Sequence, residues 1–146
     1  MTVRPVDGTE ALVRGYYDAW DAGDPARVEA CFGVDFSTTY TDEQGETVRV
    51  EAGDVHDWIT GWLDIVADMD HEIHSLVADG DQVMTRITYR GTHVGEVFSV
   101  EPTGTRVEVE EFHRFRIRDG RIVELDWLSD DLSFLRQLGL ELPVDR

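Results

Sequence analysis

The residues best suited to acid–base chemistry lie on one segment near the C-terminus. Residues 106–117, RVEVEEFHRFRI, alternate apolar and polar side chains, as a strand with two unlike faces does. One face carries Glu111 and His113 among apolar side chains, and this face should point inward. A free imidazole titrates near ~6.5, so such a histidine can exchange protons at working pH. The sequence therefore predicts a catalytic His113, and a structural core histidine is the alternative.

Glu111 precedes this histidine by two residues and shares its face. A carboxylate turned into an apolar interior is costly unless it is paired or faces a ligand. We therefore expect Glu111 to contact the substrate. The alternative is that this end of the strand is solvated at the mouth of a cavity.

The following strand offers carboxylates that could act as partners of His113. Strict alternation would place Trp127 inward and Asp126 outward. A β-bulge would bring Asp126 inside, because one extra residue reverses the faces. Asp130 is the second candidate, although it also fits the N-cap of a following helix. We expect Asp126 or Asp130 to complete the acid–base pair.

Aromatic side chains at helical and strand spacing predict the walls of an apolar cavity. Such walls favour a flat, hydrophobic ligand, and the alternative is that the rings only fill the core. His93, in a Gly-Thr-His turn, either lines the rim or bonds a turn carbonyl. The predicted wall residues are Tyr16, Trp20, Trp58, Trp62, Tyr89 and Trp127.

Metal and cofactor signatures are missing from the sequence. His71 and His74 are three residues apart on a predicted strand and would face opposite sides. No HExxH motif, cysteine pair or histidine triad occurs, and no GxGxxG, Walker or GxSxG pattern. All 13 basic residues are arginine, so Schiff-base catalysis by lysine is excluded. We expect neither a metal nor a cofactor.

The negative net charge limits the classes of binding partner to expect. A formal net charge of −18 repels nucleic acid and anionic membranes, so neither is an expected partner. No apolar run approaches the ~20 residues that span a bilayer, and no signal-peptide core is present, which predicts a cytoplasmic protein. Abundant carboxylates without lysine further predict adaptation to concentrated salt. The single cysteine, Cys31, is expected to be buried and unreactive.

The hydrophobic periodicity changes from helical in the first half of the chain to alternating in the second. This order predicts one α+β domain over residues 1–146. Helices are expected at 7–23, 24–32 and 54–69, and a terminal helix after Asp130 or Asp131. Strands are expected at 34–41, 47–50, 73–77, 83–90, 106–117 and 121–128.

Several motifs resemble those of the SnoaL-like polyketide cyclases, a family of the nuclear-transport-factor-2-like superfamily. They are GTHVGE (91–96), PTG (102–104), RIRDGRIVE (116–124) and RQLG (136–139), within a likeness that begins at YYDAWDAGD (16–24). The resemblance implies a cone-shaped α+β fold, in which a curved, mainly antiparallel sheet wraps three N-terminal-half helices and a short C-terminal helix follows. It also implies that His113 matches the catalytic histidine. Trp127 then holds the position of the family's acid–base aspartate, because Asp126 comes before the tryptophan.

The family likeness implies a cofactor-free enzyme that abstracts a proton next to a carbonyl group and closes a C–C bond within a small hydrophobic molecule. Isomerisation and epoxide or ester hydrolysis are alternatives for the same cavity. Trp127 at the aspartate position favours another alternative, a non-catalytic binder of a small hydrophobic molecule. The charged outer face of residues 106–116 predicts a homodimer with arginine–glutamate pairs across its axis.

Overall fold

The architecture is α+β, with helices first and a long antiparallel sheet after them, as the sequence predicts. The computed structural model describes residues 8–143, and in this part of the chain no helix is long and apolar enough to cross a membrane. The elements are α1 (Thr9–Asp21), α2 (Pro25–Glu29), β1 (Ser37–Thr41), β2 (Thr47–Glu51), a 3-10 turn (Ala52–Asp54), α3 (Val55–Ile65), β3 (Val66–Asp79), β4 (Gln82–His93), β5 (Arg106–Arg118), β6 (Arg121–Ser129) and α4 (Asp131–Gln137).

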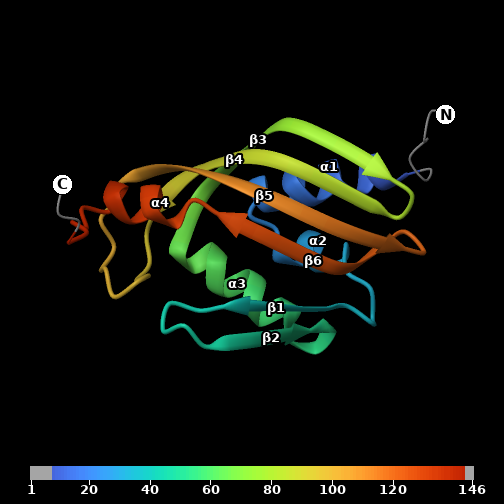
Figure 1. Cartoon of the computed structure of the whole chain (residues 1–146), viewed down its shortest axis with the longest axis horizontal. Coiled ribbons are helices and arrows are strands. Elements are labelled where there is room, and N and C mark those ends of the chain that lie inside the picture. The colour runs from blue at the N-terminus through green and yellow to red at the C-terminus, as the bar shows by residue number, and fades with distance from the viewer. Residues whose placement is uncertain (1–7, 144–146) are drawn as a thin grey trace.

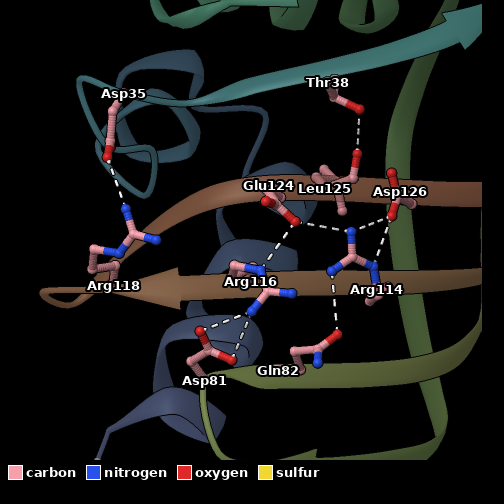
Figure 2. Close-up of polar contacts among 10 residues, drawn as sticks. All are labelled: Asp35, Thr38, Asp81, Gln82, Arg114, Arg116, Arg118, Glu124, Leu125 and Asp126. Carbon is pink, nitrogen blue, oxygen red and sulfur yellow. Dashed lines mark hydrogen bonds and ion pairs between the residues drawn. The ribbon is translucent and has the colours of Figure 1, made fainter.

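The main sheet has the strand order β3-β4-β5-β6 and is antiparallel throughout. It curves across the molecule with α1 behind it and α3 below, while the β1–β2 hairpin lies beside α3 (Figure 1). Strand β1 is tied to β6 by a hydrogen bond in which the Thr38 hydroxyl donates to the Leu125 carbonyl at 2.5 Å (Figure 2). Side chains of the helices and of the sheet together line a cavity.

Strand β5 sits between β4 and β6 and sets which side chains enter that space. His113 pairs with Thr85 on one side and Trp127 on the other. Alternation buries Phe115 completely on the inner face and leaves Phe112 half exposed on the outer face. The alternation predicted for this strand is the one observed.

Helix α1 supplies the side chains that pack under the inner face. Val13, Tyr16, Tyr17 and Trp20 follow one stripe at helical spacing, and all four are buried. Tyr16 and Tyr17 reach β5, where both rings contact Phe115 edge-on. The same stripe therefore builds the core and faces strand β5.

The third helix ends earlier than its apolar stripe predicts, at Ile65 instead of Met69. Two glycines of the GTHVGE motif allow strand β3 to start there. A Cβ at Gly95 would overlap the Asp64 carbonyl oxygen, and one at Gly91 would overlap the Val66 side chain. The Ile65 carbonyl accepts the Val94 N–H at 2.8 Å. This hydrogen bond to the residue that follows β4 draws the chain into the sheet and ends the helix.

The other boundaries differ only at their ends. The second helix closes at Glu29, short of the expected Phe32, and Asp7 at the expected start of the first helix lies outside the described residues. Strand β3 begins at Val66 rather than Ile73, since the chain enters it directly from α3.

Candidate active site

A cavity of about 560 Å³ lies between the helices and the inner face of the sheet. This volume suits a small molecule. Within residues 8–143, no arginine is among the side chains that line it. The lining residues are Tyr16, Trp20, Tyr40, Thr41, Asp42, Glu43, Asp57, Trp58, Gly61, Trp62, Ile65, Met69, His71, Tyr89, Val97, Phe98, Glu111, His113, Leu125, Trp127, Ser129, Asp131 and Phe134.

His113 is held on the cavity wall by partners at both ring nitrogens. Its Nδ1 lies 2.6 Å from the Tyr17 hydroxyl, and its Nε2 lies 3.4 Å from Oε1 of Glu111. The Tyr17 hydroxyl is also 2.7 Å from Oγ1 of Thr85. Only 8% of the His113 side chain and 15% of the Glu111 side chain are exposed, so both groups are largely withdrawn from water.

One arrangement of protons gives each of the four linked side chains, Thr85, Tyr17, His113 and Glu111, a partner. Burial raises the pKa of Tyr17, so its phenol stays protonated and can donate. Tyr17 then donates to Nδ1 of His113, and Thr85 donates to the Tyr17 oxygen. This leaves the proton of neutral His113 on Nε2, directed toward the Glu111 carboxylate, which can only accept. The separation of 3.4 Å from Glu111 is longer than a usual N–H···O hydrogen bond, so this N–H is also a donor available to a ligand in the cavity.

A second imidazole on the cavity wall belongs to His71 of β3. Its Nδ1 lies 2.5 Å from Oδ1 of Asp21, and its backbone N–H donates to Oδ2 of the same carboxylate at 3.1 Å. The His71 side chain is only 7% exposed. Because Asp21 ends α1, this double contact also joins the helix to the sheet.

Tyr17 separates the two imidazoles. Its ring centroid lies 5.1 Å from that of His71 and 5.7 Å from that of His113, and the His113 ring is stacked on it. Neither Tyr17 nor the Asp21–His71 pair is singled out by the sequence. Asp21 and His71 are 50 residues apart, so no local motif could indicate their contact.

Aromatic rings from α1, α3, β4 and β6 form much of the remaining cavity wall, at the positions predicted for them. Trp58 contacts Trp20 edge-on with centroids 6.0 Å apart, and it meets Trp127 at 5.7 Å. Tyr40, from the β1–β2 hairpin, extends this wall with a centroid 5.4 Å from that of Trp127. Tyr16, Trp62 and Tyr89 also line the cavity. These rings give a ligand a large aromatic contact surface.

Asp131, at the first residue of α4, is a wall residue that the sequence suggests only as a helix cap. Burial raises the pKa of its carboxyl group, a hydrogen bond from Ser129 opposes that shift, and the charges of Glu111 and Asp130 add to it. A carboxyl group with this tendency keeps its proton to higher pH than usual. The cavity thus contains a carboxyl that can hold or release a proton.

Asp126 does not reach the cavity, which corrects the expectation that it partners His113. The pairing of β5 with β6 is continuous over 111–116, so no bulge reverses the faces there. Asp126 therefore points outward and accepts a hydrogen bond from Nε of Arg114 at 2.7 Å (Figure 2). Trp127 occupies the inner position beside His113.

Asp130 and His93 also lie outside the cavity lining. Asp130 is exposed and caps α4, since its Oδ1 accepts the Ser133 backbone N–H at 3.1 Å. His93 is completely buried, and its Nδ1 accepts the Thr103 backbone N–H at 3.1 Å, which fixes the Pro-Thr-Gly turn. These positions suit structural roles for both residues and correct the expectation of a rim position for His93.

Metal-ligand geometry is absent from the described chain. Over residues 8–143 no three His, Cys, Asp or Glu side chains are arranged to hold a metal ion. His74, the one histidine of β3 besides His71, lies on the outer face and bonds the Thr88 hydroxyl at 2.6 Å. Cys31 is buried as expected, and burial raises the pKa of its thiol.

The sequence model of one family, described as SnoaL-like polyketide cyclase, matches residues 10–138. The chain belongs to the SnoaL-like polyketide cyclase family. Aklanonic acid methyl ester cyclase DnrD from Streptomyces peucetius is 37% identical over 67 residues, which cover 45% of this chain and 46% of that protein. Its counterpart DauD from Streptomyces sp. strain C5 matches at 37% over 67 residues and 41% of its length. The match therefore spans less than half of these curated relatives.

Solved structures of the SnoaL-like kind share the fold. AclR, a suggested hydroxylase from Streptomyces galilaeus, has a TM-score of 0.77 and 29% identity, over 94% of this chain and 83% of its own. IdmH, a suggested polyketide cyclase from Streptomyces antibioticus, has a TM-score of 0.75 and 29% identity, over 90% of this chain and 98% of its own. An epoxide hydrolase of M. tuberculosis, 21% identical with a TM-score of 0.65 over 88% of this chain and 86% of its own, shares the fold alone.

Proposed function

We propose that this SnoaL-like protein is a cofactor-free acid–base enzyme acting on a small hydrophobic carbonyl compound, in the manner of a polyketide cyclase. The observation that carries the proposal is His113, whose Nδ1 is held by Tyr17 and whose Nε2 opens onto an aromatic-walled cavity beside Glu111. The family supports a substrate of the polyketide kind. The named relatives DnrD and DauD act on the methyl ester of aklanonic acid, a carbonyl compound of that class.

The geometry supports proton abstraction next to a carbonyl group. A carbonyl oxygen placed beside His113 would accept the Nε2–H, and this donor would stabilise the negative charge that develops as the neighbouring C–H bond breaks. The resulting enolate carbon would then attack a second carbonyl in the same molecule. The aromatic wall would hold the two ends together, which lowers the entropy cost of closure.

The arrangement of side chains on β6 favours one alternative function, the binding of a hydrophobic molecule without catalysis. With Trp127 inward and Asp126 bound to Arg114, the strand that carries the family's aspartate offers a ring to the ligand instead of a carboxylate. A protein that only binds a flat hydrophobic molecule would use the same wall. Catalysis and binding are therefore the two functions that an experiment must separate.

Deuterium incorporation into 2-tetralone, a bicyclic ketone, tests the proposal without the natural substrate. Purified protein in D₂O should exchange the α-protons faster than buffer does, and His113→Gln should lower the rate by 10²- to 10⁴-fold. Quenching of tryptophan fluorescence by the ketone should give nearly the same dissociation constant for both proteins. Asp126→Asn is the comparison variant and should keep the wild-type rate, because Asp126 faces outward.

Each outcome decides between the two functions. Loss of exchange with unchanged affinity in His113→Gln supports the enzyme. Binding of the ketone with no exchange above buffer in the wild-type protein supports the binder and removes the enzyme. Loss of exchange in Asp126→Asn would show that Asp126 takes part in catalysis after all.

The homodimer and the cytoplasmic location predicted from the sequence remain predictions. Arginine–glutamate pairs on the outer face are formed within one chain, such as Arg86 with Glu110, so a second copy is not needed to neutralise them. Light scattering in molar salt should give twice the monomer mass of 16.6 kDa if the homodimer forms.

A further inference from the structure

We propose that His71 is the general base of this site and that Asp21 is the residue that orients it. The proposal rests on the acid–base function proposed above and assigns its proton-accepting step. His71 lies on β3, far in sequence from His113 on β5.

Asp21 determines which nitrogen of His71 carries the proton. An ionised carboxylate can only accept hydrogen bonds. The contact of 2.5 Å between Oδ1 of Asp21 and Nδ1 of His71 therefore places a proton on Nδ1. The second oxygen accepts the His71 backbone N–H at 3.1 Å, which fixes the carboxylate in position. Neutral His71 is left with an unprotonated Nε2, the nitrogen able to accept a proton.

The free nitrogen belongs to a buried ring on the cavity wall. The His71 side chain is 7% exposed and lines the cavity. Within residues 8–143, Asp21 is the only side chain that hydrogen-bonds to it. A polar ring atom at a cavity wall with no protein partner is available to a ligand.

His113 presents the complementary group to the same cavity. Its Nδ1 accepts a hydrogen bond from the Tyr17 hydroxyl, so the neutral ring carries its proton on Nε2. The two imidazoles therefore offer opposite functions, a proton acceptor at His71 and a donor at His113. Tyr17 lies between them, with centroid distances of 5.1 and 5.7 Å, and holds their spacing.

This pairing gives a balanced reaction step. Nε2 of His71 takes the α-proton, the C–H bond breaks, an N–H bond forms, and the electron pair of the C–H bond enters the enolate. The Nε2–H of His113 donates to the enolate oxygen. After the carbon attacks a second carbonyl of the same molecule, the proton on His71 passes to the new alkoxide. The substrate and product are isomers, so no oxidant, reductant or co-reactant is required.

A purely structural role must be separated from this one, since the Asp21–His71 contact also joins α1 to β3. Nitrogen-15 NMR of the wild-type protein, recorded where the imidazole is neutral, gives a first answer without any substrate. The expected signature is a protonated Nδ1 and an unprotonated Nε2 for His71, with the reverse for His113. A proton found on Nε2 of neutral His71 overturns the proposal.

Variants supply the second answer, with 2-tetralone exchange as the assay. His71→Gln should lower kcat by 10²- to 10⁴-fold with little change in KM, because the base is lost while the aromatic wall remains. Asp21→Asn should cause a comparable loss, since its amide NH₂ can donate to Nδ1 and so moves the proton to Nε2. The same NMR experiment should show this tautomer change in Asp21→Asn, which a structural tether alone would not produce.

Matched controls lie on the same elements. His74→Gln changes a histidine on the outer face of β3, and Asp18→Asn changes an exposed aspartate of α1. Both should keep the wild-type kcat. If His71→Gln retains exchange while His113→Gln loses it, the enzyme stands and the assignment of His71 is wrong. A wild-type protein that shows no exchange overturns both proposals.

Discussion

The two faces of strand β5 carry the same kinds of side chain in opposite electrostatic settings. On the outer face, Glu110 pairs with Arg86, and Glu108 pairs with Arg90. On the inner face, the sole ionic partner of Glu111 among residues 8–143 is His113, a group that is charged only when protonated.

The outer face continues as a network across the sheet. Arg114 contacts both Glu124 and Asp126, and Arg116 contacts Glu124 and Asp81 (Figure 2). The two arginines hold the pKa of Glu124 below its usual value, so this carboxylate stays ionised. Carboxylates fixed in this way contribute solubility and a small stabilisation, and they cannot move protons near neutral pH.

The inner face lacks these fixed counter-charges. No arginine reaches the described cavity wall, and burial raises the pKa of Asp131 there. A carboxyl group with a raised pKa therefore lies on the cavity wall. The difference between the faces shows that alternation along one strand separates an ion-paired surface from a cavity wall without such pairs.

The largest contrast between the faces is expected for two phenylalanines. Phe115 is completely buried and Phe112 is 54% exposed. Phe115→Ala should lower the free energy of unfolding by about 3–5 kcal/mol, through lost burial and a cavity in the core. Phe112→Ala should cost less than about 1 kcal/mol. Urea unfolding of both variants measures this contrast. A loss at Phe112 that grows with protein concentration would instead show that a second copy covers it.

Two adjacent glutamates provide the same contrast for activity. Glu111→Gln should slow 2-tetralone exchange about tenfold, equivalent to about 1.4 kcal/mol, because His113 loses the anion beside its Nε2. Glu110→Gln removes only an exposed pair with Arg86 and should change stability by less than about 0.5 kcal/mol, with no effect on exchange. Equal rates for the two variants would contradict the functional difference between the faces.

The dependence of Tm on salt should show whether ion pairs or charge repulsion has the larger effect on stability. Screening weakens the outer ion pairs, but it also reduces the self-repulsion of a chain with a net charge of −18. We expect the second effect to dominate and Tm to rise by about 4 °C or more in molar KCl, corresponding to ~1 kcal/mol. A thermal scan in KCl that shows a falling Tm would mean that the outer pairs dominate stability.

The smallest effect is expected from Asp131. Its folded-state pKa is raised, so the folded protein holds a proton that the unfolded chain has already released. This contribution is fully present below the usual aspartate pKa of about 3.9 and is lost as pH rises through the folded-state value. Asp131→Asn should therefore be slightly more stable than wild type near neutral pH, by less than about 0.5 kcal/mol for a side chain this exposed. The difference should vanish in acid; a constant difference across the pH range would contradict the raised pKa.

Much of the fold follows from short-range patterns. The stripe of Val13, Tyr16 and Trp20 and the alternation around His113 identify a helix and a strand, because burial on one face selects the period. The same patterns place Glu111 and the aromatic rings inward. Together with the motifs at 91–96 and 116–124, they are sufficient for the family and for the cavity walls.

Only the tertiary structure decided which carboxylates reach the cavity. The direction of Asp126 depends on whether β6 contains a bulge beside it. The pairing with β5 is continuous from Glu124 to Ser129, and its one register shift lies before Glu124, so Asp126 keeps its outward direction. The early end of α3 at Ile65 likewise depends on a long-range contact, the hydrogen bond from the Val94 N–H to the Ile65 carbonyl. The contact between Asp21 and His71 joins a helix end to a strand 50 residues later, and such long-range contacts leave no periodic signal in the chain. The sequence by itself determined which positions share a face of a helix or a strand, because alternation and helical spacing are local. Strand register and contacts between distant elements arise only when the whole sheet closes over α1.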